Sequence, residues 1–463
     1  MRGALLLLGI AAGCYQPSPA TGRPCAENGA CPEGLACIAG TCELPGTGDA
    51  AMADTAMADA AIDACPAATC SGNDIVGCGA PVTCANGCSE VGGAHCMQLV
   101  PSNGVMTSLL VGATANVGGG ENWHFHPYDG EIHRGNQTLR APGTGVIAGI
   151  RFEIIDGMGV FAANSFTSAT TDNWSADGPN PLVLFAATTI TVRGDIDVGA
   201  SGSTGGPGGS DATGSMSGTG CRGRAGRFFS AGFGEGGGGG GGRTAGANGG
   251  NSNQGASAGL GGTSCTAAPT TLPLRGGAGG GHGGDSINNA GGGGGGALAL
   301  IAMDSIVVTG DVGAPGEGGN AGTPGTAPTG DGGGGGGGGG AVLLEAPRVT
   351  VSGALTANGG GGAAPTTGDG NRGYLGSSTA ASGGSFTGPG GTRSGGTGGT
   401  GTVSPTVGST YIQDDALVPP TVIITRGAGG GGAAGRTEIK SLMRTTTGAT
   451  LSPAPTLSSA TVQ

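Results

Sequence analysis

The sequence predicts an all-β protein: a glycine-rich parallel β-solenoid, with β-helix-like repeats, that follows disulfide-rich N-terminal modules and a disordered tether. Two observations carry this prediction. Glycine fills 113 of the 463 positions, and its longest runs end where short apolar, β-branched segments begin. Three of these segments resemble one another, so each is expected to bury its apolar face by stacking on the next copy, which is how a solenoid is organised.

The repeat consists of alternating apolar residues interrupted by a glycine. Its first two copies match at one constant offset, and the third is one residue shorter after its alanine. The copies comprise Leu182, Leu184, Ala186, Ile190, Val192, Gly194 and Ile196; Leu298, Leu300, Ala302, Ile306, Val308, Gly310 and Val312; and Val342, Leu344, Ala346, Val349, Val351, Gly353 and Leu355. Because side chains alternate along a strand, we expect one face of each strand to be buried and the other to be small or polar. Earlier strands are predicted over 108–117, 145–155 and 158–166.

The glycine runs are expected to connect these strands. Only 10% of the residues are charged and the mean hydropathy is +0.05, whereas disordered chains are usually highly charged and poor in apolar residues. The runs include 236–242, 291–296 and 332–340. They either stay loose or pack as extended left-handed helices, because glycine has no side chain to keep neighbouring backbones apart.

The charge balance argues against nucleic-acid and nucleotide partners. The net charge is −12 and Lys440 is the only lysine, whereas a phosphate backbone is bound by clustered Lys and Arg. A phosphate-binding loop needs a glycine before its lysine, but Ile439 precedes Lys440. We therefore expect the protein to bind neither nucleic acid nor nucleotide.

The first residues predict export. A charged start is followed by an apolar stretch over 3–12, which is too short to span a bilayer. Residues 11–14 are Ala-Ala-Gly-Cys, which is similar to the cleavage site of bacterial lipoproteins, although those usually have leucine where Ala11 stands. We expect a lipoprotein signal over 1–13, lipidation of Cys14, and an outer-membrane or cell-surface location in which the lipid anchor binds the membrane. An ordinary signal peptide is the alternative.

The cysteines are expected to form disulfides. There are thirteen, and an odd number would leave one free thiol in an exported protein, but lipidation of Cys14 removes the odd residue. None of the others shows the Cys-x2-Cys spacing of zinc sites, and small exported segments without a core are commonly held by disulfides. The candidates fall into three even groups: Cys25, Cys31, Cys37 and Cys42; Cys65, Cys70, Cys78, Cys84, Cys88 and Cys96; and Cys221 and Cys265.

These features divide the chain into six expected segments. After the signal, a four-cysteine module occupies 14–47 and an Asp/Ala-rich linker occupies 48–64. A six-cysteine module follows over 65–104. The glycine-rich β-repeat domain is expected over 105–443, and a flexible C-terminal tail over 444–463.

Several motifs resemble those of myxobacterial glycine-rich, cysteine-cluster surface lipoproteins. They are Cys-x-Glu-Asn-Gly-x-Cys-Pro-x-Gly-x-x-Cys from Cys25 to Cys37, Leu-Arg-Gly-Gly at 274–277, Leu-Glu-Ala-Pro-x-Val-x-Val-x-Gly at 344–353 and Gly-Arg-Thr-Glu-Ile at 435–439. With the lipoprotein start and the acidic tether, the resemblance covers nearly the whole chain. It implies a lipid-anchored surface location and a repetitive β fold. The family has no settled activity, so the resemblance implies none.

One segment offers candidate metal ligands. Three of the five histidines lie within 124–133, and the four-residue loop 127–130, which contains Asp-Gly, predicts a β-hairpin. Alternation then places Trp123, Phe125 and Ile132 on one face. The opposite face carries His124, His126, Glu131 and His133, a set that zinc or another transition metal accepts. The alternative is a hydrated polar face that binds nothing, and apart from this divalent metal we expect no cofactor.

Two other strings are expected to result from composition. The string Gly-Ala-Ser-Ala-Gly at 255–259 lacks the strand and helix that a nucleophile elbow requires. The segment 280–288 fits a calcium-binding nonapeptide once, although that motif works in tandem. No catalytic residue is therefore predicted.

The sequence thus predicts a non-enzymatic cell-surface lipoprotein with a structural or adhesive role in the envelope. The alternative is a glycan- or surface-binding module carried on the solenoid, whose partner would be envelope polysaccharide or another cell surface. A metal-dependent enzyme that uses the histidine hairpin is the third hypothesis.

Overall fold

The chain divides into two compact units, Met1–Pro66 and Ala67–Gln463. The signal, Cys14, Cys25, Cys31, Cys65, Cys78 and the linker 48–64 lie outside the described residues. The computed structural model describes residues 23–24, 36–38, 41–43, 68–77, 80–84, 86–90, 93–213, 220–229, 233–252, 258–265, 274–284, 289–321, 332–365, 367–388, 391–414 and 423–463.

Small antiparallel sheets form the N-terminal parts of both units. In the first unit, the order β1-β3-β2 joins β1 (Arg23–Pro24), β3 (Thr41–Glu43) and β2 (Ala36–Ile38). In the second unit, one sheet consists of β4 (Thr69–Ser71), β5 (Asp74–Val76) and β6 (Val82–Thr83), and another of β7 (Cys88–Ser89) and β8 (His95–Cys96).

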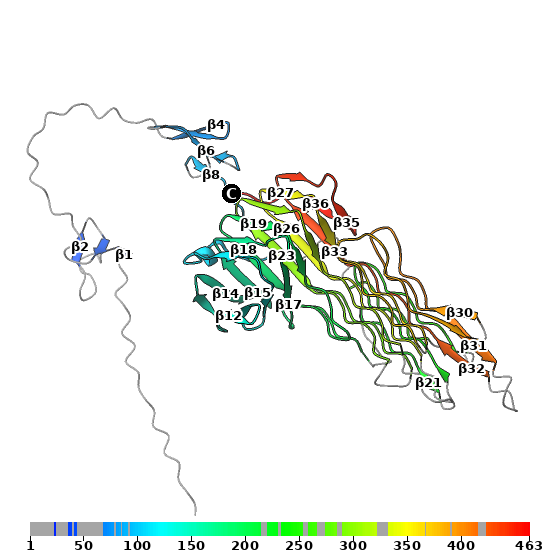
Figure 1. The fold of residues 1–463 in the computed structure, drawn as a ribbon. Helices are drawn as coiled ribbons and strands as arrows, with labels where there is room; N and C mark the ends of the chain where they lie inside the picture. Colours follow the sequence, from blue (N-terminus) through cyan, green and yellow to red (C-terminus); the bar gives the residue numbers. More distant parts are fainter. Residues whose placement is uncertain are drawn as a thin grey trace, which may run out of the picture. The chain divides into compact units, whose positions relative to one another are not determined.

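The rest of the second unit contains a parallel β-solenoid, so the predicted fold class is confirmed (Figure 1). Successive coils contribute strands to three sheets. In spatial order, sheet I comprises β13 (Gly145–Ile147), β14 (Ile150–Ile155), β15 (Met158–Ala163), β18 (Leu182–Ala186), β23 (Ala297–Ala302), β26 (Ala341–Glu345), β33 (Arg436–Lys440) and β36 (Thr456–Ser458). Sheet II comprises β34 (Met443–Thr445), β27 (Arg348–Val351), β24 (Ser305–Val308), β19 (Thr189–Val192), β16 (Ser165–Thr167) and β9 (Asn116–Gly118). Sheet III comprises β12 (Gln137–Arg140), β11 (Ile132–Arg134), β10 (Trp123–Phe125), β17 (Asn173–Ala176), β20 (Asp195–Asp197), β25 (Asp311–Gly313), β28 (Ala354–Thr356) and β35 (Thr450–Ser452).

The repeat residues stack in register. In sheet I, Leu182 pairs with Leu298, which pairs with Val342. The corresponding columns are Ile190, Ile306 and Val349 in sheet II, and Ile196, Val312 and Leu355 in sheet III. All of these side chains are buried in one continuous core. The predicted stacking of the copies is therefore confirmed, because equivalent apolar side chains meet in the solenoid interior.

Sheet I differs from the expectation of one buried and one polar face. Its strands β15, β18, β23 and β26 are buried at every position. The outward side chains Val183, Phe185 and Ile301 join a second apolar cluster with Leu99 and Leu109. The segment that supplies these last residues includes a 3-10 helix, η1 (Thr107–Leu110), where a strand over 108–117 was expected. A sheet covered on both faces requires apolar side chains in both directions.

The glycine runs are ordered and pack side by side as extended helices. In run 332–340, every third backbone N–H donates to the same neighbouring run. Residues 332, 335 and 338 donate to run 278–284, and residues 333, 336 and 339 donate to run 427–433. Residues 334, 337 and 340 donate to run 314–320. The carbonyls of run 332–340 accept hydrogen bonds from runs 237–240, 292–295 and 360–363. A three-residue period with hydrogen bonds only to neighbouring chains is the geometry of packed polyproline II-type helices.

We call this assembly the glycine bundle. It comprises runs 236–242, 246–250, 259–262, 276–284, 291–296, 314–320, 332–340, 357–364, 395–399 and 427–435. Several runs continue directly into solenoid strands, as 291–296 does into β23 and 332–340 into β26. Figure 1 shows the bundle extending from the strands of the solenoid. Of the two states that the sequence left open for the glycine runs, the structure shows the packed one.

Short hairpins lie at the end of the bundle away from the solenoid (Figure 1). They are formed by β21 (Phe228–Phe229) with β22 (Phe233–Gly234), by β29 (Ser385–Gly388) with β30 (Gly391–Ser394), and by β31 (Thr410–Asp414) with β32 (Ile423–Gly427).

The expected flexible tail over 444–463 differs from the structure. This segment supplies β35 and β36 to sheets III and I. Beyond them, Gln463 and Gln98 exchange backbone hydrogen bonds, and Leu99 forms a bridge with Val462. The tail is tied down because its apolar Leu451 packs against the solenoid core. The same contacts join Gln98 and Leu99, which the sequence assigned to the six-cysteine module, to the C-terminal end of the chain.

Candidate metal centre

The hairpin of β10 and β11 has the register expected from the sequence. His124 pairs with His133, and Phe125 pairs with Ile132. At the loop, the backbone N–H of His126 donates to the carbonyl of Glu131 at 3.0 Å. Trp123, Phe125 and Ile132 are buried in the solenoid core. Alternation therefore turns the three imidazoles and Glu131 away from the core, onto the outer face of sheet III.

A buried arginine holds the loop of this hairpin. Arg140 is 0% exposed, and its guanidinium donates to the carbonyls of Gly130, Ala141, Gly143, Gly145 and Ile150. Burial lowers the pKa of this guanidinium, while nearby carboxylates oppose the change. The five carbonyls replace the water that the charge has lost. The loop 127–130, which directly follows His126, is thus held in place by Arg140.

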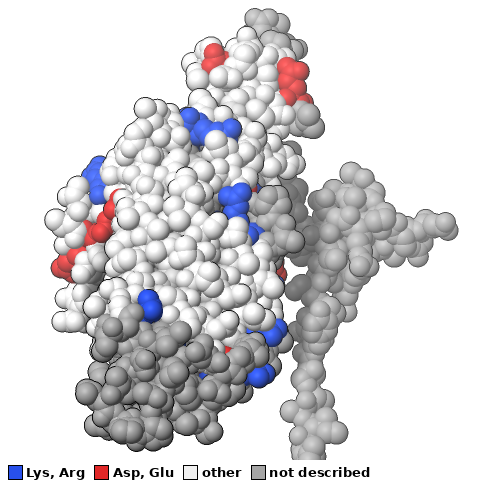
Figure 2. Space-filling view, turned by 90° about the vertical axis from the view of Figure 1, so that its right-hand side faces the viewer, with Lys and Arg blue, Asp and Glu red and all other residues white. Residues whose placement is uncertain are grey.

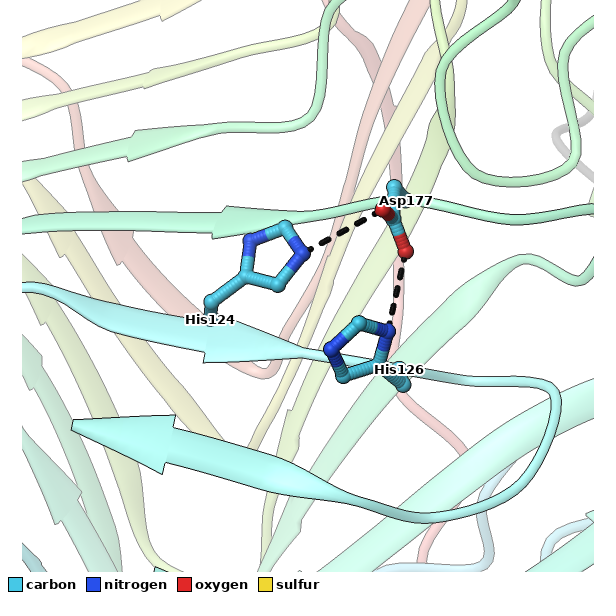
Figure 3. A group of neighbouring side chains, drawn as sticks. All are labelled: His124, His126 and Asp177. Carbon is cyan, nitrogen blue, oxygen red and sulfur yellow. Dashed lines mark ion pairs between the residues drawn. The ribbon is translucent and has the colours of Figure 1, made fainter. Parts of the chain in front are cut away.

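The structure brings His124 and His126 together with Asp177 (Figure 3). His124 Nε2 lies 3.4 Å from Asp177 Oδ2, and His126 Nδ1 lies 3.1 Å from Asp177 Oδ1. Both rings point toward the one carboxylate. The side chain of His126 is 15% exposed, that of His124 35% and that of Asp177 59%. We call these three residues the aspartate triad.

A second group shares His126. Glu131 Oε1 lies 3.3 Å from His133 Nε2, and one ligand atom from each of His126, Glu131 and His133 lies within 4.8 Å of the others. The Thr138 hydroxyl donates to Glu131 Oε1 and contacts His133 Nδ1, both at 3.4 Å. We call His126, Glu131 and His133 the glutamate triad. All four residues that the sequence nominated therefore lie on one face, but in two overlapping groups.

Tyr128 borders both groups. Its hydroxyl lies 3.1 Å from His126 Nδ1. Desolvation, and then the charges of Asp129, Asp177 and Glu131, raise the pKa of the phenol above its usual 10.0. The phenol therefore remains protonated at neutral pH beside the imidazole.

Asp177 was missed by the sequence analysis, although the sequence carries a signal for it. In sheet III, β17 lies parallel to β10, with Trp123 beside Trp174 and His124 beside Ser175. The pair Asn-Trp occurs at 122–123 and again at 173–174, and the Asn173 N–H donates to the Asn122 side chain at 3.0 Å. Aligning these pairs places Asp177 beside His126. The copy was overlooked because its outward residues differ from those of the hairpin.

The cysteines that the structure describes with side chains form disulfides, which indicates an exported protein. The pairs are Cys70–Cys88, Cys84–Cys96 and Cys221–Cys265. Cys37 and Cys42 are backbone neighbours across β2 and β3. Among the described residues, no helix is long and apolar enough to cross a membrane.

The described residues of the two strings attributed to composition, 258–259 and 280–284, lie in or beside the glycine bundle. Residues 280–284 are part of one run, where the backbone N–H of His282 donates to the carbonyl of Thr213 at 2.9 Å. Burial lowers the pKa of the His282 imidazole. Ser257 and Asp285 lie outside the described residues.

Fold and site together define a β-solenoid protein with an attached polyglycine bundle and a histidine-rich outer face at its first coils. No family model, curated protein or solved structure matches the chain.

Proposed function

We propose that the protein is a non-enzymatic surface lipoprotein with a structural or adhesive role in the cell envelope. The glycine bundle is the observation that supports this proposal most directly. Every residue of run 332–340 is buried, and the run is hydrogen bonded to its neighbours in several directions along its whole length. Such a body suits a rigid projecting element, because each backbone restrains those around it.

The anchor in this proposal is a lipid on Cys14. The sequence around Cys14 and the even number of other cysteines support it. The acidic linker 48–64 would then separate the solenoid from the outer membrane. A protein anchored in this way in the outer leaflet contacts surfaces outside the cell.

The surface composition suits contact with uncharged surfaces better than binding to charged polymers. Figure 2 shows one face on which Lys, Arg, Asp and Glu are scattered among uncharged residues. Only 10% of the chain is charged. Contacts with such a face depend on backbone, hydroxyl and small apolar groups, which suit neutral polysaccharide or another cell surface.

Two experiments test the proposal. In a diderm bacterial host, a palmitate analogue should label the wild type and not Cys14→Ser, and only the wild type should sediment with outer membranes. Equal labelling of the two would contradict the anchor. In the source organism, deletion of the gene should change detergent sensitivity or attachment to surfaces, and the Cys14→Ser form should fail to restore it. An unchanged phenotype in both assays would refute the structural and adhesive role.

A glycan-binding role is the second candidate, and one cavity favours it. A hollow of about 410 Å³ in the glycine bundle is lined by Arg224, Arg227, Asn248, Asn251, Leu260 and Val407. Guanidinium and amide groups beside apolar side chains are suited to sugar hydroxyls and ring faces. Specific binding on a glycan array, lost in Asn248→Ala, would support this role, whereas an array without specific binding would exclude it.

A further inference from the structure

We propose that the aspartate triad binds one divalent transition-metal ion of the zinc class, which fastens the terminal hairpin to the next coil of the solenoid. The inference is independent of the structural or adhesive role. It rests on three observations: the spacing of the ligand atoms, the hydrogen bond that orients His124, and the position of Asp177 on another coil.

The ligand atoms lie close to the spacing of a tetrahedral site. Zinc binds imidazole nitrogen and carboxylate oxygen at about 2.0–2.2 Å, so neighbouring ligand atoms of a tetrahedron lie about 3.3–3.6 Å apart. His124 Nε2 lies 3.4 Å from Asp177 Oδ2, and His126 Nδ1 lies 3.1 Å from Asp177 Oδ1, so each imidazole faces a different oxygen of the same carboxylate. One ligand atom from each residue lies within 4.8 Å of the others. Small rotations of the side chains suffice to bring all three into contact with one ion.

The outer hydrogen bond of His124 favours the same arrangement. Its Nδ1 lies 2.9 Å from the Ser175 hydroxyl. When Nδ1–H donates to that hydroxyl, Nε2 carries the lone pair and faces Asp177. Metal-binding histidines commonly have such a partner on the other ring nitrogen, which fixes the tautomer and the ring orientation.

The ion is assigned to the aspartate triad rather than to the glutamate triad because of His126. The Nδ1 atom of this residue faces Asp177 at 3.1 Å. In the glutamate triad, the 3.3 Å contact joins Glu131 to His133 and does not involve His126, and Thr138 contacts both of these residues. Glu131 then remains a nearby negative charge that offsets the excess positive charge of an ion held by one carboxylate.

The ligands come from two coils. His124 lies on β10 and His126 directly after it, whereas Asp177 directly follows β17. Strands β10 and β17 pair in parallel along the outer face of sheet III. An ion held by both coils therefore fastens the terminal hairpin to the solenoid. Because the triad is partly exposed, water completes the coordination of the ion.

Zinc titration of the purified mature chain, in competition with a chromogenic chelator, tests the site. We expect one ion per chain. His124→Ala and Asp177→Asn should each weaken binding at least about 100-fold, and Ser175→Ala about tenfold, as is usual for partners outside the ligand shell. Matched controls are His95→Ala and Asp156→Asn, which should bind zinc as the wild type does. Asp156 lies in a turn at φ 49°, a conformation that asparagine adopts readily.

Two outcomes would overturn the assignment. Equal zinc affinity of the wild type and Asp177→Asn would show that the aspartate triad is not the zinc site. Loss of binding in His133→Ala together with retention in Asp177→Asn would place the ion in the glutamate triad.

The fastening role is tested separately by urea unfolding with and without zinc. Zinc should raise the wild-type midpoint, because an ion that binds only the folded state stabilises it. Zinc should leave the urea midpoint of Asp177→Asn unchanged. Because each protein is compared with itself, with and without zinc, this test holds even when a variant is less stable than the wild type. Binding without any change in the wild-type midpoint would refute the fastening role.

Discussion

Substitution of one buried glycine by alanine provides the sharpest test of the glycine bundle. We choose Gly336, at the centre of run 332–340. A Cβ at this position would lie 2.6 Å from the carbonyl carbon of Gly360, and closer still to its oxygen. Carbon atoms in contact lie about 3.5–4.0 Å apart. The two runs must therefore separate by about 1 Å to admit one methyl group.

The hydrogen bonds between these runs set the size of the effect. Gly360 N–H donates to Gly337 at 2.9 Å, and Ala363 N–H donates to Gly334 at 2.8 Å. A separation of about 1 Å breaks both bonds and leaves two donors and two acceptors without partners, and each buried group of this kind costs about 1–3 kcal/mol. We expect Gly336→Ala to lower the free energy of unfolding by at least about 4 kcal/mol. Reduced backbone freedom of the unfolded chain offsets at most about 1 kcal/mol of this loss.

Hydrogen exchange measured by mass spectrometry and urea unfolding should both report the change. Peptides that cover 332–340 and 357–363 should lose protection in Gly336→Ala. Gly120→Ala is the matched control, because a Cβ there would meet nothing within 4 Å. If Gly336→Ala keeps wild-type protection and the same urea midpoint as Gly120→Ala, the described packing of the runs is refuted.

Three further predictions concern single interactions. Arg140→Met should lower the free energy of unfolding, measured by urea titration with tryptophan fluorescence, by at least about 3 kcal/mol, since hydrogen bonds to charged groups contribute about 1.5–3 kcal/mol each. Burial raises the pKa of the Glu345 carboxyl above its usual 4.5, so the folded state keeps this proton to higher pH than the unfolded state does. Wild-type stability should therefore fall as pH rises above 4.5. Thermal unfolding measured on either side of pH 4.5 should show a smaller loss of stability in Glu345→Gln than in the wild type. Replacing Cys221 and Cys265 by serine opens a link across a sequence separation of 44, and the urea midpoint should drop by the equivalent of about 4 kcal/mol.

Each of these predictions has a contrary result. An unchanged midpoint for Arg140→Met would show that the loop carbonyls need no charged donor. Parallel pH profiles for Glu345→Gln and the wild type would assign the slope to other carboxyls, such as Glu317, whose pKa burial also raises. Equal midpoints for the double serine variant and the wild type would mean that the bundle already restrains the segment between the two cysteines.

The fold could be predicted wherever side chains carry the pattern. Leu182, Leu298 and Val342 repeat because they occupy one interior column, so matching them in the sequence found the stacked coils. The outer face of sheet I escaped the prediction, because the cover from Leu99 and Leu109 is distant in sequence. The glycine runs carry no side-chain period, so their three-residue hydrogen-bond period was invisible in the sequence.

In the candidate site, too, residues close together in sequence could be predicted, whereas residues brought together only by the fold could not. The four hairpin residues are near one another in sequence, and alternation along a strand placed them on one face. Asp177 comes from the following coil, and its place depends on the parallel register of Trp123 beside Trp174. Arg140 was also missed, because its partners are backbone carbonyls, which any sequence supplies.

The two parts of the second unit are stabilised by different interactions, and this explains why the composition alternates so sharply. The solenoid depends on burial of apolar side chains, so its strands are rich in Leu, Ile and Val. The bundle depends on backbone hydrogen bonds between closely packed runs, and at positions such as Gly336 even a methyl group would meet the neighbouring backbone. A run such as 332–340 must therefore change to apolar residues where it enters β26. Lengthening the glycine runs would extend the bundle without any change to the solenoid core, so the length of the bundle is set independently of the fold that supports it.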